Sequence, residues 1–211
     1  MTTMPEATPP DPKTTLRRYL QGTRENLLWK LEGLSERDVR LPRTPTGTNL
    51  LGLVKHAAGT EIAYFGGTFS RPWPTPEDVP WLPLTPEAPW PDDPNVDFYA
   101  TADESIADVV ALYRKVWAFS DETIESLPLD APGHVFWWGD GAVTLHQILV
   151  HVIVDLSRHA GHADILREGV DATVGMRQGN SNIPDGVDWP AHVARLRGIA
   201  EQFPAGPGSP A

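Results

Sequence analysis

The chain has 211 residues, 40% of them hydrophobic, which is enough for one sizeable core in one domain. Its formal net charge of −11 argues against nucleic-acid binding and offers no basic surface to an anionic membrane. Cysteine is absent, which excludes disulfides, thiolate ligands and a cysteine nucleophile, so any thiol must come from another molecule. The sequence has no apolar run of ~18 residues and no signal-peptide pattern, which predicts a cytoplasmic protein without a membrane-spanning helix.

The first elements in chain order are an arm and a helix. Residues 1–12 are rich in proline and threonine, and we expect a disordered arm there. Over residues 13–33 apolar side chains recur every three or four positions, which predicts a helix with one buried face. Arg18 lies beside that face and could reach a site, although a solvated arginine is the more common arrangement. Residues 35–47 are polar and interrupted by prolines, which indicates a connection.

A second helix is predicted over residues 50–66, with Thr48 or Asn49 as its cap. It is apolar around much of its circumference and carries His56 in its middle. Two interpretations of this histidine stay open, a hydrogen-bonded core residue or a metal ligand. Glu61 and Tyr64, further along, either support a site or are polar residues near the helix end.

The stretch over residues 69–98 is unusual because it combines frequent prolines with three tryptophans, Trp73, Trp81 and Trp90. Prolines at this density exclude a regular helix or an interior strand. A loop this long inside a compact domain is uncommon, and it is usually functional or a long crossover. We expect the tryptophans to pack it down on the domain, as a substrate cover or as an apolar lid over one end.

A third helix is predicted to follow, with Thr101 and Glu104 as a capping box and its apolar face reaching Leu127. The connection after it, PLDAPGHVFWWGDGA, is rich in glycine. Its Trp137 and Trp138 could form the wall of a pocket. Neither here nor elsewhere does the sequence contain a convincing strand.

The fourth helix is predicted over residues 143–168, with Thr144 and Gln147 as a capping box. One face carries four polar residues beside an apolar stripe, because steps of three and four residues match the helical repeat. They are His151, Asp155, His159 and His162. Buried imidazoles and carboxylates need partners, and a divalent metal is one of them. Hydrogen-bonded or solvent-facing histidines are the alternative.

A short last helix is predicted over about residues 189–202, with Asp188 as its N-cap, followed by a disordered tail over residues 204–211. The expected fold is all-α. It is a four-helix bundle domain over residues 13–203, with a long crossover loop between the second and third helices and a short C-terminal helix.

A bundle of this kind can place the second and fourth long helices side by side. His56 would then face Asp155 and His159. Two imidazoles and one carboxylate form a three-ligand set with open positions, which is typical of catalytic metal sites rather than closed structural ones. His162 is close enough in sequence to be a fourth or outer ligand, and His151 is a further alternative.

Two segments carry a resemblance to a known family. They are LVKHAAGTE around His56 and VDLSRHAGHADILRE from Val154. The chain resembles the DinB-like superfamily of metal-binding four-helix bundles over roughly residues 13–203, and most closely an actinobacterial branch. Characterised relatives of that branch include mycothiol-dependent maleylpyruvate isomerase and the mycothiol and bacillithiol S-transferases.

The resemblance implies a divalent metal held by His56, Asp155 and His159. Relatives have Glu or His where this chain has Asp155, which is one methylene shorter and could let His162 compete as a ligand. Zinc suits such ligands best, although nickel and others also bind them. The implied reaction is S-transfer of a mycothiol-like thiol to an electrophilic small molecule. A metal-dependent hydrolase and a metal-binding bundle without activity are the alternatives. The resemblance also leads us to expect a homodimer.

Overall fold

The computed structural model describes residues 9–204 and 206. The predicted disordered arm and tail, residues 1–12 and 204–211, fall largely outside these residues. The chain divides into two compact units, residues 1–181 and residues 182–211, and the first contains the helical bundle.

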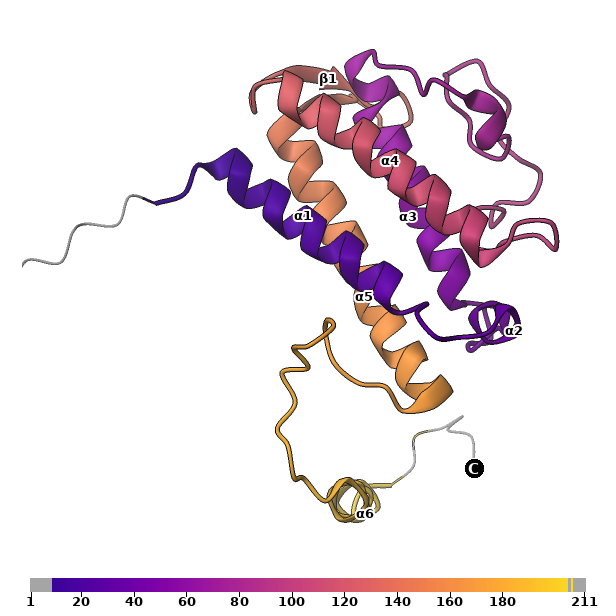
Figure 1. The fold of residues 1–211 in the computed structure, drawn as a ribbon, viewed down its shortest axis with the longest axis vertical. Helices are drawn as coiled ribbons and strands as arrows, with labels where there is room; N and C mark the ends of the chain where they lie inside the picture. The colour runs from indigo at the N-terminus through magenta and orange to yellow at the C-terminus, as the bar shows by residue number, and fades with distance from the viewer. Residues whose placement is uncertain (1–8, 205, 207–211) are drawn as a thin grey trace, which may run out of the picture. The chain divides into compact units, whose positions relative to one another are not determined.

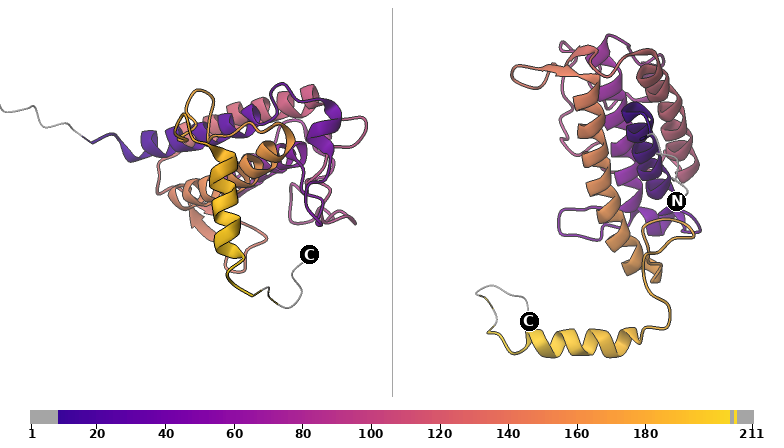
Figure 2. Two further views of the ribbon diagram at one scale, coloured as in Figure 1. Left: turned by 90° about the horizontal axis from the view of Figure 1, so that it is seen from below. Right: turned by 90° about the vertical axis from the view of Figure 1, so that its left-hand side faces the viewer.

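Four long helices build the first unit and confirm the predicted all-α bundle (Figure 1). They are α1 (Pro12–Trp29), α3 (Leu50–Phe65), α4 (Ile106–Ser126) and α5 (Leu145–Asp171). Helix α3 packs against both α4 and α5, and α1 packs against α5, as the right-hand view of Figure 2 shows. The long connection between α3 and α4 is the predicted crossover.

The most deeply buried helix is α3, and its composition explains why. It is apolar around most of its circumference, so it can be surrounded by neighbours without burying unpaired polar groups. At Gly59 a Cβ atom would lie 2.9 Å from the ring of Trp81, so only glycine lets that indole pack against the helix. The small residues of α3 therefore allow the long loop to lie close to it.

Helix starts follow capping chemistry, although one predicted cap is displaced. Helix α5 begins after Thr144, whose side chain accepts a hydrogen bond from the Gln147 backbone as predicted. The capping box of α4 is formed by Ser105 and Asp108, and not by the predicted pair four residues earlier. The second pair has the same chemistry one helical turn later, at the point where the apolar face of the helix begins.

Two elements in the first unit were not predicted. The structure forms a short antiparallel hairpin, β1 (Pro132–His134) and β2 (Ala142–Thr144), where the sequence indicated no strand. Each strand has three residues, which is too short to show the alternation that identifies a strand. At Gly141, φ is +69°, a conformation that favours glycine and allows the chain to turn back.

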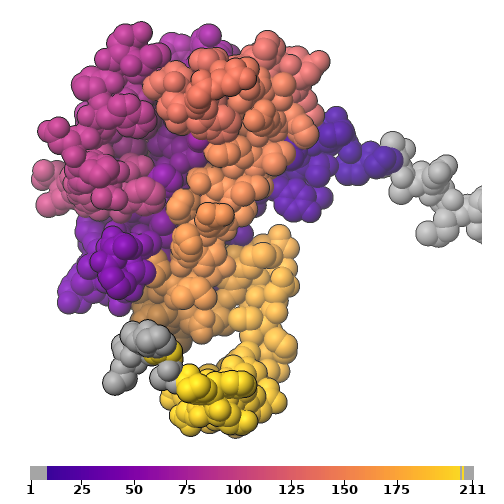
Figure 3. All heavy atoms as spheres, turned by 180° about the vertical axis from the view of Figure 1, so that it is seen from behind, coloured from indigo at the N-terminus to yellow at the C-terminus, as the bar shows by residue number. Residues whose placement is uncertain are grey.

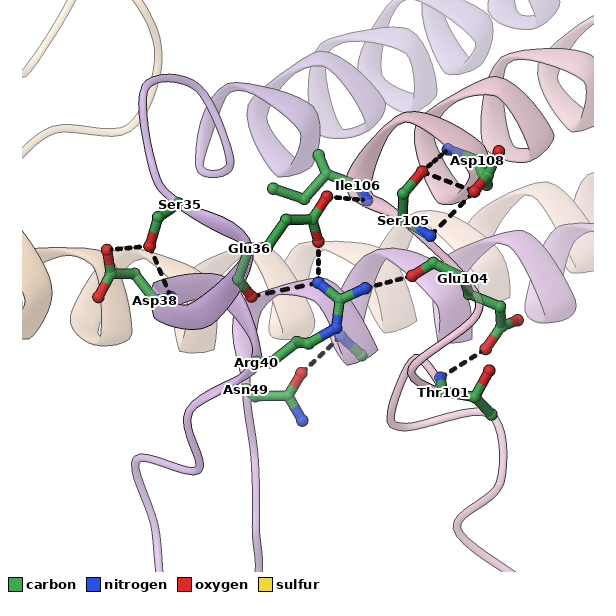
Figure 4. Close-up of polar contacts among 11 residues, drawn as sticks. Ser35, Glu36, Asp38, Arg40, Asn49, Thr101, Glu104, Ser105, Ile106 and Asp108 are labelled. Carbon is green, nitrogen blue, oxygen red and sulfur yellow. Dashed lines mark hydrogen bonds and ion pairs between the residues drawn. The ribbon is translucent and has the colours of Figure 1, made fainter.

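The other unpredicted element is the short helix α2 (Glu36–Arg40), inside the predicted connection. This helix contacts the N-terminal end of α4 (Figure 4). The Glu36 carboxylate accepts a hydrogen bond from the backbone N–H of Ile106, which is the first residue of α4. Arg40 binds both this carboxylate and the carbonyl of Glu104. A helix N-terminus leaves its first N–H groups unpaired, so these contacts stabilise α4.

The long loop contains two short 3-10 helices, η1 (Gly67–Phe69) and η2 (Pro76–Asp78), and no longer regular element. Two of its tryptophans, Trp73 and Trp81, are buried, as expected for a loop packed on the domain. Trp90 differs, because 64% of its surface is exposed.

The second unit contains α6 (Trp189–Ala200), which begins as predicted after Asp188, whose side chain accepts a hydrogen bond from the Ala191 backbone. None of the residues of α6 is buried. Among the described residues of the whole chain, no helix is both long and apolar enough to cross a membrane.

Candidate metal centre

Helices α3 and α5 bring together His56, Asp155 and His159. The nitrogen and oxygen atoms that these three side chains offer all lie within 4.8 Å of one another. Nε2 of His56 is 3.8 Å from Oδ2 of Asp155, and Nε2 of His159 is 3.8 Å from Oδ1 of the same carboxylate. The three residues proposed from the sequence therefore face one another across two helices.

Two atoms of this group are buried without a hydrogen-bond partner in the part of the chain that the structure describes. They are Oδ2 of Asp155 and Nδ1 of His159. A buried polar atom left unpaired costs about 1–3 kcal/mol. A divalent cation could pair with such atoms, and two imidazoles with one carboxylate match the donor set that zinc and similar metals prefer. The residues present therefore fit a divalent metal.

The loop supplies a partner to this group that sequence reasoning missed. Nδ1 of His56 donates to Oδ2 of Asp97 at 2.7 Å, and the ring of Phe98 stacks on the imidazole at 4.0 Å between centroids. A carboxylate on one ring nitrogen fixes the tautomer and orientation of a histidine, so the other nitrogen faces the metal position. The loop has no periodic pattern that would identify Asp97. Its position at the end of the loop is the only sequence feature that could have indicated a role.

Three contacts hold this end of the loop against α3. The Asn49 side chain donates to the carbonyl of Phe98 at 3.1 Å. That carbonyl lies so close to Gly52 that a Cβ atom there would be 1.8 Å from its oxygen. Lys55, which is 1% exposed, binds the Glu104 carboxylate at 2.9 Å. The position of the loop carboxylate on His56 is thus set by the first turns of α3.

The electrostatics of the group favour metal-binding protonation states in two of its members. Burial raises the pKa of Asp155, but the neighbouring His56 and His159 outweigh it and leave the pKa below its ordinary value. Burial, and then the positive charge of His56, lower the pKa of His159 to about 4. Burial lowers the pKa of His56, but Asp155 and Asp97 raise it more strongly. At neutral pH the site therefore holds a carboxylate and a neutral His159 imidazole, as metal ligands must be.

His151 and His162, the other two histidines singled out in α5, lie outside the three-residue group. His162 is exposed, with its ring centroid 5.5 Å from that of His159. His151 is hydrogen-bonded through Nε2 to the hydroxyl of Tyr64 at 3.0 Å. His151 therefore has a partner other than a metal, whereas His162 is placed only beside the group.

The remaining residues singled out from the sequence lie outside the three-residue group. Glu61 is fully buried in an ion pair with Arg24 and does not join the candidate centre. Arg18 is exposed, as the common arrangement for arginine suggested. Trp137 and Trp138 pack around Tyr64, with ring centroids at 5.2 and 5.7 Å.

The chain matches the model of a known protein family and is similar in fold to a solved structure. The model of a family described as mycothiol-S-transferase matches residues 15–172. Among solved structures, a conserved protein from Enterococcus faecalis is similar, with 16% sequence identity and a TM-score of 0.62. That similarity covers 78% of this chain and 100% of the other, and at this identity it shows the fold alone. No curated protein matches the sequence.

Proposed function

We propose that this chain, which belongs to the DinB-like mycothiol S-transferase family, uses a divalent metal to transfer a mycothiol-like thiol to an electrophilic small molecule. The observation that carries this proposal is the group of His56, Asp155 and His159, whose ligand atoms lie within 4.8 Å of one another. Two buried atoms of the group have no hydrogen-bond partner among the described residues. Three protein ligands leave coordination positions open for a reactant, as in catalytic sites. The absence of cysteine from the chain means that the sulfur must come from the second substrate.

The residues that would hold the metal are His56, Asp155 and His159, with Asp97 orienting His56. Zinc suits these donors best, and nickel is the main alternative. A divalent metal held there would favour the thiolate form of a bound thiol at neutral pH.

In this proposal the protein binds and orients the two substrates and shields them from water. The thiol loses its proton to water, its sulfur forms the new bond to the electrophilic carbon, and the leaving group departs with its electron pair. Phe98, stacked on His56, covers one side of the group and limits the access of water. A dry setting strengthens the electrostatic interactions on which thiolate stabilisation depends.

Two measurements test the proposal directly. The first is elemental analysis of protein purified without a metal-affinity step, for which we expect about one divalent metal per chain. The second follows 1-chloro-2,4-dinitrobenzene with and without a low-molecular-weight thiol. Product formation that needs both the thiol and the metal supports S-transfer, whereas consumption of an ester substrate without thiol would favour a hydrolase. A metal-containing protein inactive in both assays would favour a binding bundle.

A matched pair of variants tests the ligands. His159→Ala should lose most of the bound metal while its circular dichroism spectrum stays helical, because apolar packing holds the bundle. His192→Ala changes a half-buried histidine of α6 and should keep the full metal content. Full metal occupancy in the His159 variant would show that the ligands are wrongly assigned.

We also propose that the chain forms a homodimer, and that it works in the cytoplasm as its sequence predicts. Support for the dimer comes from large apolar side chains exposed along α5, which forms part of the surface seen in Figure 3. Val150, Val154 and Ile165 are 42%, 57% and 70% exposed, and they lie on one side of the helix. Sedimentation at micromolar concentration should show a dimer that Ile165→Glu weakens. A wild-type monomer would contradict this proposal without affecting the proposed chemistry.

A further inference from the structure

The loop between α3 and α4 encloses a cavity of about 400 Å³ beside the candidate metal centre. Among its lining residues are Trp81, Trp90, Asp93, Val96, Asp97 and Phe98. Two of these also touch the metal centre, because Asp97 accepts a hydrogen bond from His56 and Phe98 stacks on its ring. The cavity and the three-residue group therefore share a wall. A larger cavity of about 620 Å³, which contains none of the three residues, lies near the hairpin.

Acidic side chains predominate around this cavity. Residues 72–104 contain eight acidic residues and no lysine, arginine or histidine. Two of the carboxylates, those of Asp93 and Asp97, belong to the cavity lining. Lys55 is a nearby cation, with its Nζ 4.9 Å from the ring centroid of Trp81, but it is buried, bound to Glu104 and not itself part of the lining. A ligand with a negative charge would be repelled at this position, whereas a neutral or cationic one would not.

The cavity lining is also largely apolar, with indole and phenyl rings next to prolines. Hydrogen bonds inside the loop fix it further, since Asp93 accepts from the Tyr99 hydroxyl and from the Asn95 backbone, both at 2.9 Å. Its volume falls in the range of roughly 300–1,000 Å³ that small-molecule sites occupy. A preformed site of this kind binds without the cost of ordering a loop.

Trp90 differs in its exposure from the other tryptophans of the loop. This indole lines the cavity while 64% of its surface is exposed, although the other two tryptophans of the loop are buried. An exposed indole at the edge of an apolar cavity offers a flat face to a ligand ring.

We propose that this cavity binds an uncharged or cationic aromatic group of the electrophile, with Trp90 stacking on the ring and Asp93 and Asp97 excluding anions. The proposal rests on the proposed transferase function only in naming the ligand as the electrophile. The shared wall formed by Asp97 and Phe98 keeps such a group next to the metal centre, where its reactive carbon can meet the thiol sulfur.

The test compares three probes of one ring system by isothermal titration calorimetry on the full chain as purified. They are neutral 2-naphthol, cationic 2-naphthylmethylammonium and anionic 2-naphthalenesulfonate. We expect the first two to bind at least about tenfold more tightly than the anion, because its charge would lie close to two carboxylates. Trp90→Ala should weaken 2-naphthol binding by roughly 3- to 10-fold through loss of ring stacking. Trp189→Ala, on α6, is the matched control and should have no effect.

A second variant tests the same inference if Trp90→Ala perturbs the loop. Asp93→Asn preserves the shape of the side chain and removes its charge. It should therefore reduce the difference in affinity between the neutral and anionic probes without weakening the binding of 2-naphthol. Equal affinities for all three probes, or no binding of any, would overturn the inference even if S-transfer is observed. Selective binding without S-transfer would leave the aromatic site standing and remove the proposed function.

Discussion

Oδ2 of Asp97 lies 2.7 Å from Nδ1 of His56, so a residue at the end of a long loop orients the imidazole of a residue in the middle of α3. The same histidine directs Nε2 toward Asp155, at 3.8 Å from Oδ2. The loop is therefore part of the candidate centre and not only its cover. Carboxylates that hold a ligating histidine in this way affect metal affinity without touching the metal.

Asp97→Asn tests this relationship. The amide can still accept a hydrogen bond from His56, but it no longer carries the charge that makes the ring a stronger ligand. We expect metal affinity to fall roughly 10- to 100-fold, measured by competition with a chromophoric chelator. Asp93→Asn, four residues away in the same loop, should leave the affinity unchanged. An affinity unaltered by Asp97→Asn would mean that the contact does not support metal binding.

Gly52→Ala tests how the loop is held in place. A Cβ atom at this position would lie 1.8 Å from the carbonyl oxygen of Phe98, so the loop end must move away from α3. We expect a loss of about 1–3 kcal/mol in the free energy of unfolding, as overpacking usually causes. Metal affinity should fall as well, because Asp97 moves with Phe98. Urea unfolding and the chelator assay measure the two effects.

Gly22→Ala is the control for this substitution. It lies in the interior of α1, and a Cβ atom there would meet nothing within 4 Å apart from the backbone of its own helix and its chain neighbours. Alanine is preferred over glycine inside helices by roughly 0.5–1 kcal/mol, so this variant should be as stable as the wild type or slightly more stable. If Gly52→Ala and Gly22→Ala have the same stability and metal affinity, the Phe98 carbonyl does not lie close to Gly52 in solution.

Most of the bundle and the core of the site could be predicted because both depend on helical periodicity. His56, Asp155 and His159 stand in helices, so their spacing fixes the faces on which they lie. Asp97 could not be found in this way, because a proline-rich loop has no repeat that relates sequence spacing to direction. The two strands could not be predicted for a similar reason, because three residues are too few to show the alternation that identifies a strand.

A second kind of failure concerns buried charge. Arginine side chains are normally found at the surface, yet Arg24 of the first helix is 1% exposed. Its guanidinium binds Glu61 of α3 at 2.5 Å and Asp121 of α4 at 2.8 Å, so it is paired across three helices. Periodicity describes which face a residue takes, but it does not report a partner on another helix that makes burial of a charge acceptable.

Glu61→Gln should therefore be strongly destabilising. It leaves the guanidinium of Arg24 in the core with only one carboxylate, Asp121, and weakens the bond from the Tyr113 hydroxyl. Breaking a buried pair by removing one partner costs roughly 3–5 kcal/mol, which urea unfolding would measure.

A surface ion pair provides the comparison for this variant. Arg17 and Glu125 lie 2.7 Å apart, but their side chains are 37% and 60% exposed. Exposed pairs contribute about 0–1 kcal/mol, so Glu125→Gln should change the free energy of unfolding very little. Similar losses in Glu61→Gln and Glu125→Gln would contradict the view that the interior pair specifies how α1, α3 and α4 pack.

The end of α5 gives a prediction about pH. Arg167 binds the Asp171 carboxylate at 2.7 Å and the Lys30 carbonyl at 2.9 Å, and its hydrogen bonds lower the pKa of Asp171 to about 2. An unfolded aspartate has a pKa near ~3.9, so this stabilisation is fully present above that pH and is lost as pH falls toward 2. The wild type should thus exceed Asp171→Asn in stability at pH 7, and urea unfolding should show the gap shrinking below about pH 4. A constant gap between pH 7 and pH 3 would show that the carboxylate is not bound in this way.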